Sequence, residues 1–198
     1  MSIEILVALV VFATVTSITP GPNNLMLLSS GVNFGFRRSI PHALGISAGF
    51  LLLLLVVGAG MGSLIASLPW LYTAIKIAGG LYLLYLAWRI ATSGPIEAGG
   101  AANAKPLTFL EAAAFQWVNP KAWVMAITAM GAYTEPASYW LTMVLVAVIF
   151  SVINLPNVAI WAGLGAALRN WLADPVRLRV FNIGMAVLLV ASLWPLLR

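Results

Sequence analysis

The sequence predicts an all-α integral membrane protein with six transmembrane helices, and three observations lead to this fold class. The first is composition, because 62% of the residues are hydrophobic and 8% are charged, whereas a soluble domain carries about 25% charged residues. The second is length, because 198 residues accommodate about six spans of about 20 residues with short loops. The third is a pair of helix-breaking motifs inside long apolar runs, which indicates two related halves.

The expected helices follow the apolar runs in chain order. A stretch of low hydropathy, 94–106, is rich in Gly and Ala and reads as a linker between a first repeat (about 1–93) and a second (about 107–198). Both repeats form one transmembrane domain, 1–198, because the chain has no room for a separate soluble domain. The six spans are expected at roughly 3–32, 41–68, 71–90, 107–133, 139–168 and 180–197.

Helices 1 and 4 are expected to be broken near their middles. The motif Thr-Pro-Gly-Pro-Asn-Asn at 19–24 interrupts the first run, and Asn-Pro-Lys at 119–121 interrupts the fourth. Each proline removes a backbone donor and clashes with the preceding turn. Without a break, a first helix of about 30 residues would measure about 45 Å, against a hydrocarbon core of about 30 Å. Asn-Leu-Pro-Asn at 154–157 predicts a third interruption, in helix 5, which helix 2 lacks.

Positive side chains are unevenly distributed over the predicted loops. Cytoplasmic loops are the ones enriched in Lys and Arg, so this asymmetry predicts a multi-pass protein with both termini outside and two halves inverted relative to each other. The same loop residues account for most of the positive net charge, so no nucleic-acid partner is expected. The expected partner is the lipid bilayer. The loops after helices 2 and 4 carry no Lys or Arg, whereas those after helices 1, 3 and 5, with their flanks, carry Arg37, Arg38, Arg89, Lys105, Arg169, Arg177 and Arg179.

The sequence lacks the residues of several kinds of active site. There is no cysteine and a single histidine, which excludes thiolate ligands and a histidine-based zinc site. No group of histidines, cysteines or paired acids recurs at one depth of the predicted bundle, so we expect no enzyme activity, no metal and no cofactor. Glycines four residues apart, such as Gly45 and Gly49, fit close helix packing, either inside the bundle or across a homodimer.

The two breaks provide the chemistry of a binding site near the middle of the membrane. A helix that restarts there presents free N–H groups and a partial positive charge, which suit a carboxylate, and Lys121 adds a full charge. Broken helices at corresponding positions of inverted repeats point to a secondary transporter, and these groups suit a small zwitterion such as an amino acid. The predicted substrate-binding residues are Pro20, Gly21, Pro22, Asn23, Asn24, Asn119, Pro120, Lys121, Asn154 and Asn157.

Few residues are candidates for energy coupling, because no acidic residue lies at the centre of a predicted helix. Lys121 is the first candidate, since burial disfavours its charged form and its proton can then be linked to substrate. Glu111 lies about two to three turns from it. His42 carries an imidazole, which titrates near neutral pH, and we expect it at the cytoplasmic interface near Arg38.

Together these motifs resemble the lysine-exporter (LysE/RhtB) family of bacterial amino-acid exporters. The resemblance covers nearly the whole chain, including its length, its six spans and its internal linker. It implies export of amino acids or related metabolites from the bacterial inner membrane, driven by the proton gradient, with the prolines, Gly21, Asn119 and Lys121 of the two breaks as core positions. The absence of a central acid makes a cationic substrate less favoured than a neutral one. The resemblance rests on the motif at 19–23, Gly31, Gly35, Arg37, Gly45 and the motif at 119–121.

Two other interpretations are left open by the sequence. In an exporter that works by alternating access, the two breaks grip the substrate. A channel, or a membrane subunit that does not itself transport, would not need such a grip. Saturable flux that depends on a gradient separates the carrier from the channel.

Overall fold

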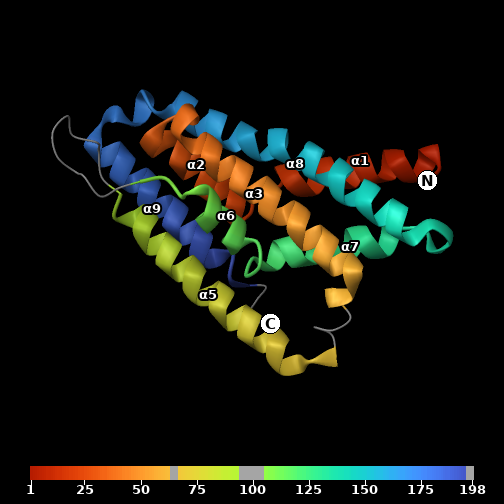
Figure 1. Ribbon diagram of the computed structural model, residues 1–198. Coiled ribbons are helices and arrows are strands. Elements are labelled where there is room, and N and C mark those ends of the chain that lie inside the picture. Colours follow the sequence, from red (N-terminus) through yellow and green to blue (C-terminus); the bar gives the residue numbers. More distant parts are fainter. Residues whose placement is uncertain (63–66, 94–104, 195–198) are drawn as a thin grey trace.

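The computed structural model describes residues 1–62, 67–93 and 105–194, and within these ranges the chain is helical and has no strand. Long helices run back and forth beside one another to form an elongated bundle (Figure 1). In chain order the elements are α1 (Ile3–Ile18), α2 (Pro22–Phe34), α3 (Phe36–Val56), the π-helical turn η1 (Val57–Met61), α5 (Pro69–Ala91), α6 (Phe109–Phe115), α7 (Pro120–Tyr133), η2 (Pro136–Ser138), α8 (Tyr139–Leu168), η3 (Trp171–Ala173) and α9 (Pro175–Ala191).

Three helical segments, 36–61, 73–91 and 136–168, are long and apolar enough to cross a membrane. The pair α1 and α2, bent by 55° at the break between them, makes a fourth if it is counted as one span. The described residues thus support three or four spans by length and composition. The arrangement as six spans in two inverted repeats stays a prediction, because α6 and α7 are short pieces on either side of the second break and α9 has 17 residues.

Small residues set the closest approaches between helices. A Cβ atom at Gly31 of α2 would collide with the backbone of α8 at Ala162, and one at Gly165 of α8 would collide with the backbone of α2. Gly45 and Gly49 of α3 meet the backbone of α6 in the same way. These glycines therefore serve contacts inside the bundle, which leaves them unavailable as the close-packing face of a homodimer.

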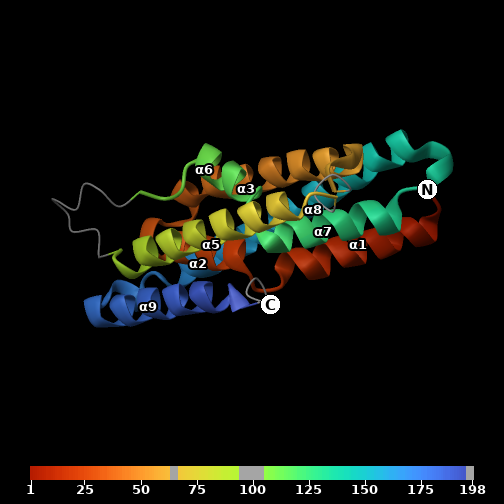
Figure 2. The same ribbon diagram turned by 90° about the horizontal axis from the view of Figure 1, so that it is seen from below.

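The largest buried cluster joins α1, α3, α7 and α8, and α1 and α7 run alongside each other toward the end of the bundle where the N-terminus lies (Figure 2). At its centre the rings of Phe50 and Phe150 meet edge to face, with centroids 5.1 Å apart, and Phe12 packs on Phe150 at 5.8 Å. Aromatic pairs in this geometry add stabilisation beyond their buried area. The cluster fixes α1 against α3 and α8, and so holds the first break in place.

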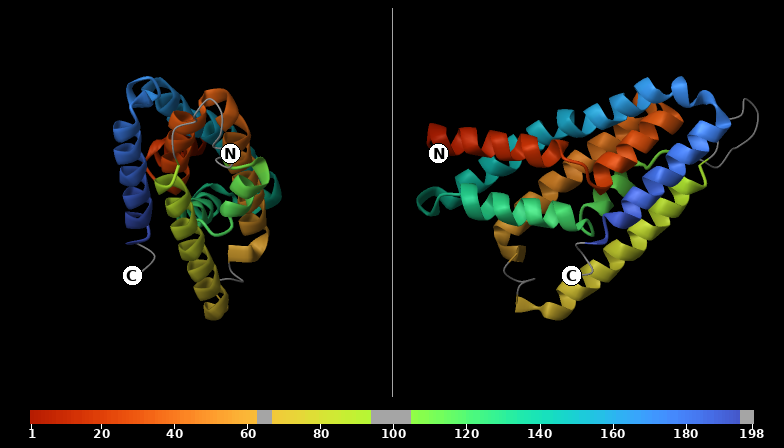
Figure 3. Two further views of the ribbon diagram at one scale, coloured as in Figure 1. Left: turned by 90° about the vertical axis from the view of Figure 1, so that its left-hand side faces the viewer. Right: turned by 180° about the vertical axis from the view of Figure 1, so that it is seen from behind.

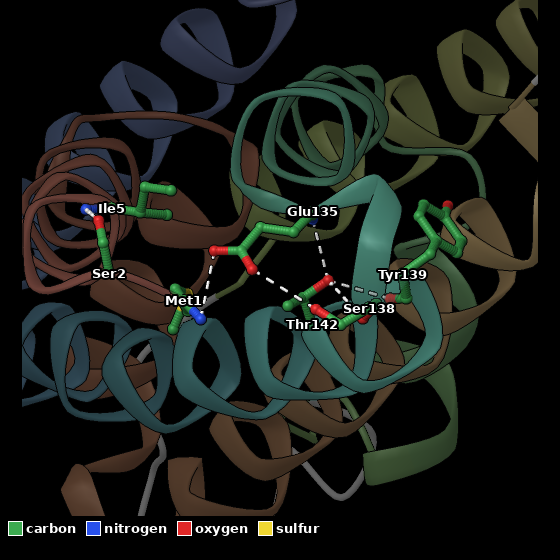
Figure 4. A network of polar contacts seen from close by, with 7 residues as sticks. All are labelled: Met1, Ser2, Ile5, Glu135, Ser138, Tyr139 and Thr142. Carbon is green, nitrogen blue, oxygen red and sulfur yellow. Dashed lines mark hydrogen bonds and ion pairs between the residues drawn. The ribbon is translucent and has the colours of Figure 1, made fainter.

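The two ends of the bundle differ in charge. Arg37 and Arg38 open α3, Arg89 closes α5 and Arg177 opens α9, and these helix ends gather at one end of the molecule, on the left in Figure 1. We call this the basic end. At the opposite end the Met1 ammonium pairs with Glu135 at 3.2 Å (Figure 4).

The predicted interruption of helix 5 is wrong. The segment forms a single helix, α8, with Pro156 inside it. Pro156 is exposed on the outer face of the bundle, and a proline removes one backbone donor, a loss that the turns on either side tolerate. The neighbouring Asn157 amide donates to the Ile153 carbonyl at 2.8 Å, so it too serves its own helix.

Helix 2, which was expected to be regular, departs from α-helical geometry within its described residues. It begins at Phe36 and passes after Val56 into the π-helical turn, where Gly60 has φ 109°. That conformation strongly favours glycine, but Gly58, Gly60 and Gly62 alternate here, and their spacing does not tell which of them adopts it. Residues 63–66 of the second predicted span, 94–104 of the predicted linker and 195–197 of the last predicted span lie outside the described residues.

Candidate functional site

The first predicted break is present between α1 and α2, where Thr19 ends α1 and Gly21, in an extended conformation, precedes Pro22 at the first position of α2. The carbonyl groups that the end of α1 exposes are all satisfied. Ser17 O and Thr19 O accept from the Asn24 amide, both at 2.8 Å, and Ile18 O accepts from Trp161 Nε1 at 3.2 Å. A helix end buried without such partners would be costly.

The backbone N–H groups at the start of α2, unlike these carbonyls, lack hydrogen-bond partners in the described part of the chain. No side chain caps this helix. Leu25 N–H bonds to Gly21 O at 3.0 Å, but no hydrogen bond among the described residues uses the backbone N–H of Asn23 or Asn24. The first break therefore presents two free donors at the positive end of a helix dipole, which is an anion-binding arrangement.

The second predicted break is present between α6 and α7. The chain leaves α6 in a turn and restarts at Pro120, with Asn119 as the residue before the helix. The Asn119 Oδ1 atom accepts the backbone N–H of Lys121 at 3.2 Å. This helix start supplies its own cap, so it keeps one fewer free donor than the start of α2.

The two breaks contact each other, and the view from behind shows them close together in the middle of the molecule (Figure 3). Lys121 Nζ donates to Thr19 O at 2.7 Å and to Thr19 Oγ1 at 3.0 Å. The side-chain amides of Asn23 and Gln116 bond to each other in both directions, at 2.8 and 3.1 Å. A Cβ on Gly21 would lie 2.9 Å from Lys121 Cδ, so glycine leaves the space in which the lysine stem lies.

A small cavity lies at this junction. Lys121 is the one charged side chain among the described residues that line it, and no acidic residue is among them. Ser17 Oγ and Asn154 Oδ1 are buried there without a hydrogen-bond partner. The lining residues are Thr16, Ser17, Gly21, Asn23, Asn24, Phe50, Gln116, Asn119, Lys121, Ala122, Met125, Asn154 and Val158.

The structure brings six of the ten predicted substrate-binding residues to this cavity and leaves four outside its lining. Pro20 is exposed, Pro22 and Pro120 hold the first positions of α2 and α7, and Asn157 bonds within α8. The prolines thus shape the backbone and do not line the space. The six that line the cavity are Gly21, Asn23, Asn24, Asn119, Lys121 and Asn154.

Of the coupling candidates, Lys121 lines the cavity and the other two do not. Glu111 closes a capping box with Thr108 at the start of α6 and pairs with Arg89 at 3.6 Å. His42 is 1% exposed, and neither ring nitrogen has a partner within the described residues. Because α3 begins at Phe36, ahead of the predicted start, His42 lies within its second turn and is packed inside the bundle, and its place at the cytoplasmic interface stays a prediction.

Sequence reasoning did not foresee the apolar part of the lining. Phe50, Ala122, Met125 and Val158 resemble any other apolar residue of a membrane helix, and only the packing places them here. One periodic signal was available, since Val158 follows Asn154 by one helical turn and therefore shares its face. Within the described residues no three His, Cys, Asp or Glu side chains cluster to hold a metal ion.

Apolar helices interrupted around a small polar cavity are typical of a membrane transporter, and the comparisons define the class further. The chain matches the LysE type translocator family over residues 14–192. It is 34% identical over 191 residues, 96% of each chain, to the cysteine/O-acetylserine efflux protein of Escherichia coli (strain K12). The protein of that name from Shigella flexneri is 34% identical over 180 residues, 90% of each chain. No solved structure matches this chain.

The chain therefore belongs to the LysE translocator family. It is an efflux transporter of that family and not an enzyme, as the sequence motifs predicted.

Proposed function

We propose that this protein is a secondary active exporter of small amino acids with neutral side chains, and that the junction of the two breaks holds the substrate carboxylate. One observation carries the proposal: the carbonyls exposed by the first break are all satisfied, whereas the N–H groups of Asn23 and Asn24 are free. A site that has spare donors and a neighbouring ammonium, Lys121, is matched to an anionic group.

The charge of the cavity limits the rest of the substrate. Lys121 balances one carboxylate, and no acidic side chain among the described lining residues could balance a second ammonium. A buried, unpaired charge is costly, so a lysine-like substrate is disfavoured and a zwitterion with an uncharged side chain is favoured. The relatives named for efflux of cysteine and O-acetylserine support this choice, because both compounds are small amino acids of that kind.

Transport by alternating access requires that the two halves move relative to each other. The contacts of Lys121 with Thr19 and of Asn23 with Gln116 join the first half to the second at the site itself. A carboxylate that takes the Lys121 ammonium competes with Thr19 for it, and this links binding to the contact between the halves. Lys121 is also the coupling candidate that lines the cavity, and we assign proton linkage to it.

The orientation follows from the basic end of the bundle. We place this end in the cytoplasm of a bacterium whose inner membrane the protein spans, because Lys and Arg are enriched in cytoplasmic loops. Met1, which pairs with Glu135 at the other end, then lies outside. The chain would bind substrate from the cytoplasm and release it outward.

Purified protein in liposomes tests the proposal. With an imposed pH gradient, we expect saturable transport of labelled L-cysteine or O-acetyl-L-serine and much weaker transport of L-lysine. Dissipating the gradient with a protonophore should abolish net accumulation. Flux that does not saturate would indicate a channel, and no flux of any amino acid would indicate a subunit that does not transport.

A further inference from the structure

Two buried oxygen atoms in the cavity have no role in holding the fold together. Ser17, 3% exposed, and Asn154, 4% exposed, line the cavity from α1 and α8. Ser17 Oγ and Asn154 Oδ1 have no hydrogen-bond partner among the described residues. Buried polar side-chain atoms are nearly always paired, so each exception requires an explanation.

The other buried asparagines show that this chain normally satisfies its amides. Asn33 and Asn182 bond to each other at 3.0 and 3.3 Å, Asn24 bonds to the end of α1, and Asn119 caps α7. Asn154 has no side-chain hydrogen bond of this kind. Since it lines the cavity and the paired amides hold backbone or each other, its free oxygen is available to a ligand.

From this we infer that Ser17 Oγ and Asn154 Oδ1 form the subsite for the amino group of the substrate. The inference rests on the proposed function, which seats the carboxylate at Lys121 and the start of α2. An ammonium group needs acceptors, and a hydroxyl and an amide oxygen provide two. Neutral acceptors can hold an ammonium group, because a hydrogen bond whose donor is charged is stronger than one between two neutral groups.

The subsite makes a free amine a requirement for tight binding. An analogue that keeps the side chain and the carboxylate but lacks the amine leaves both oxygens unpaired. Hydrogen bonds to a charged group contribute enough that this loss weakens binding by about tenfold to a hundredfold. The protein would thus reject simple carboxylic acids that share the cytoplasm with its substrate.

The test is counterflow of labelled L-cysteine, kept reduced, in liposomes that contain the purified protein. The competitors are unlabelled L-cysteine and 3-mercaptopropionate, which has the same thiol and carboxylate without the amine. In the wild type we expect 3-mercaptopropionate to inhibit at least about tenfold more weakly than L-cysteine. In Asn154→Leu, L-cysteine should inhibit counterflow as weakly as 3-mercaptopropionate does. The inhibition constant of 3-mercaptopropionate itself should change little.

Asn157→Leu is the matched control, because Asn157 lies on the same helix outside the cavity lining. It should keep the wild-type discrimination. If Asn154→Leu does not give folded protein, Ser17→Ala removes a single oxygen atom and should still reduce the discrimination severalfold. Equal inhibition by L-cysteine and 3-mercaptopropionate in the wild type would overturn the inference. So would an equal loss of inhibition by both competitors in Asn154→Leu, or an unchanged ratio of their inhibition constants in Ser17→Ala.

The two levels of the proposal fail in different ways. If the wild type catalyses L-cysteine counterflow but shows no preference for a competitor with an amine, the amino-group subsite is contradicted and the exporter function still stands. Absence of counterflow with both L-cysteine and O-acetyl-L-serine in the wild type would contradict the proposed function and, with it, the subsite.

Discussion

The two breaks look alike in sequence and differ in how the chain completes them. At the second, Asn119 caps the new helix and its carboxamide oxygen satisfies the Lys121 N–H. At the first, Gly21 has no side chain to offer, and the N–H groups of Asn23 and Asn24 stay free. The carbonyls of the first break, by contrast, are satisfied by Asn24, Trp161 and Lys121.

This difference indicates a division of roles. The first break offers backbone donors to a ligand, and the second break, already closed by its own cap, supplies the ammonium of Lys121 that reaches across to Thr19. A glycine at the start of α2 is therefore functional as well as permissive, since a capping side chain there would occupy the donors that the account assigns to substrate.

Removing the charge that the second break supplies should have the largest effect. Lys121→Met keeps the stem over Gly21 but leaves a buried substrate carboxylate without its partner, which lowers transport by about a hundredfold or more. Thr19 O retains its bond from Asn24, so the fold should persist. Counterflow and thermal unfolding in detergent measure the two effects. Lys76→Met, outside the cavity lining, is the control, and a matching loss of activity there would contradict the role of Lys121.

Giving the first break a cap like that of the second sharpens the comparison. In Gly21→Ser the added hydroxyl can accept from the N–H of Asn23 or Asn24, in competition with the substrate. A serine cap in place of glycine gains only about 0.4 kcal/mol, so the half-saturation concentration should rise about twofold while stability increases slightly. Gly21→Ala crowds Lys121 in the same way but adds no acceptor. If Gly21→Ala and Gly21→Ser have the same half-saturation concentration and the same stability, the free N–H groups do not bind substrate.

Removing the Asn119 cap tests the same comparison at the second break. Asn119→Ala should cost about 1 kcal/mol of stability, the usual cost of a lost cap, and should raise the half-saturation concentration by a smaller factor than Gly21→Ser. Thermal unfolding and L-cysteine counterflow report these values. An unchanged melting temperature would show that the Asn119 cap does not stabilise α7.

The smallest effect is expected where the sequence suggested a third break. Pro156→Ala restores one backbone donor inside a continuous helix, on an exposed face and outside the cavity lining. Transport rate and affinity in liposomes should therefore stay within about twofold of the wild type, as for surface changes that touch no special feature. A large loss would mean that α8 bends at Pro156 during transport.

Proline and glycine chemistry allowed both breaks to be located from sequence, because their effect on the backbone is local. Pro156 misled for a geometric reason: whether a proline breaks a helix depends on its surroundings, and this one faces outward. The irregular backbone at Gly60 was not predicted, because the sequence does not show which conformation a glycine within a helical run adopts.

The cavity was predictable only in part. Asparagines and Lys121 at the breaks were identified because polar groups at that depth are expensive and therefore informative. The contact of Lys121 with Thr19, the pairing of Asn23 with Gln116 and the unpaired Ser17 depend on how helices from the two halves pack. No local pattern in the sequence encodes those distances.

The central claim is that a substrate carboxylate binds where the start of α2 meets Lys121, and a structure of the protein with bound L-cysteine tests it most directly. We expect carboxylate oxygens within about 3 Å of the backbone nitrogens of Asn23 and Asn24 and of Lys121 Nζ. A bound amino acid whose carboxylate lies away from the start of α2, with those two N–H groups still free, would contradict it.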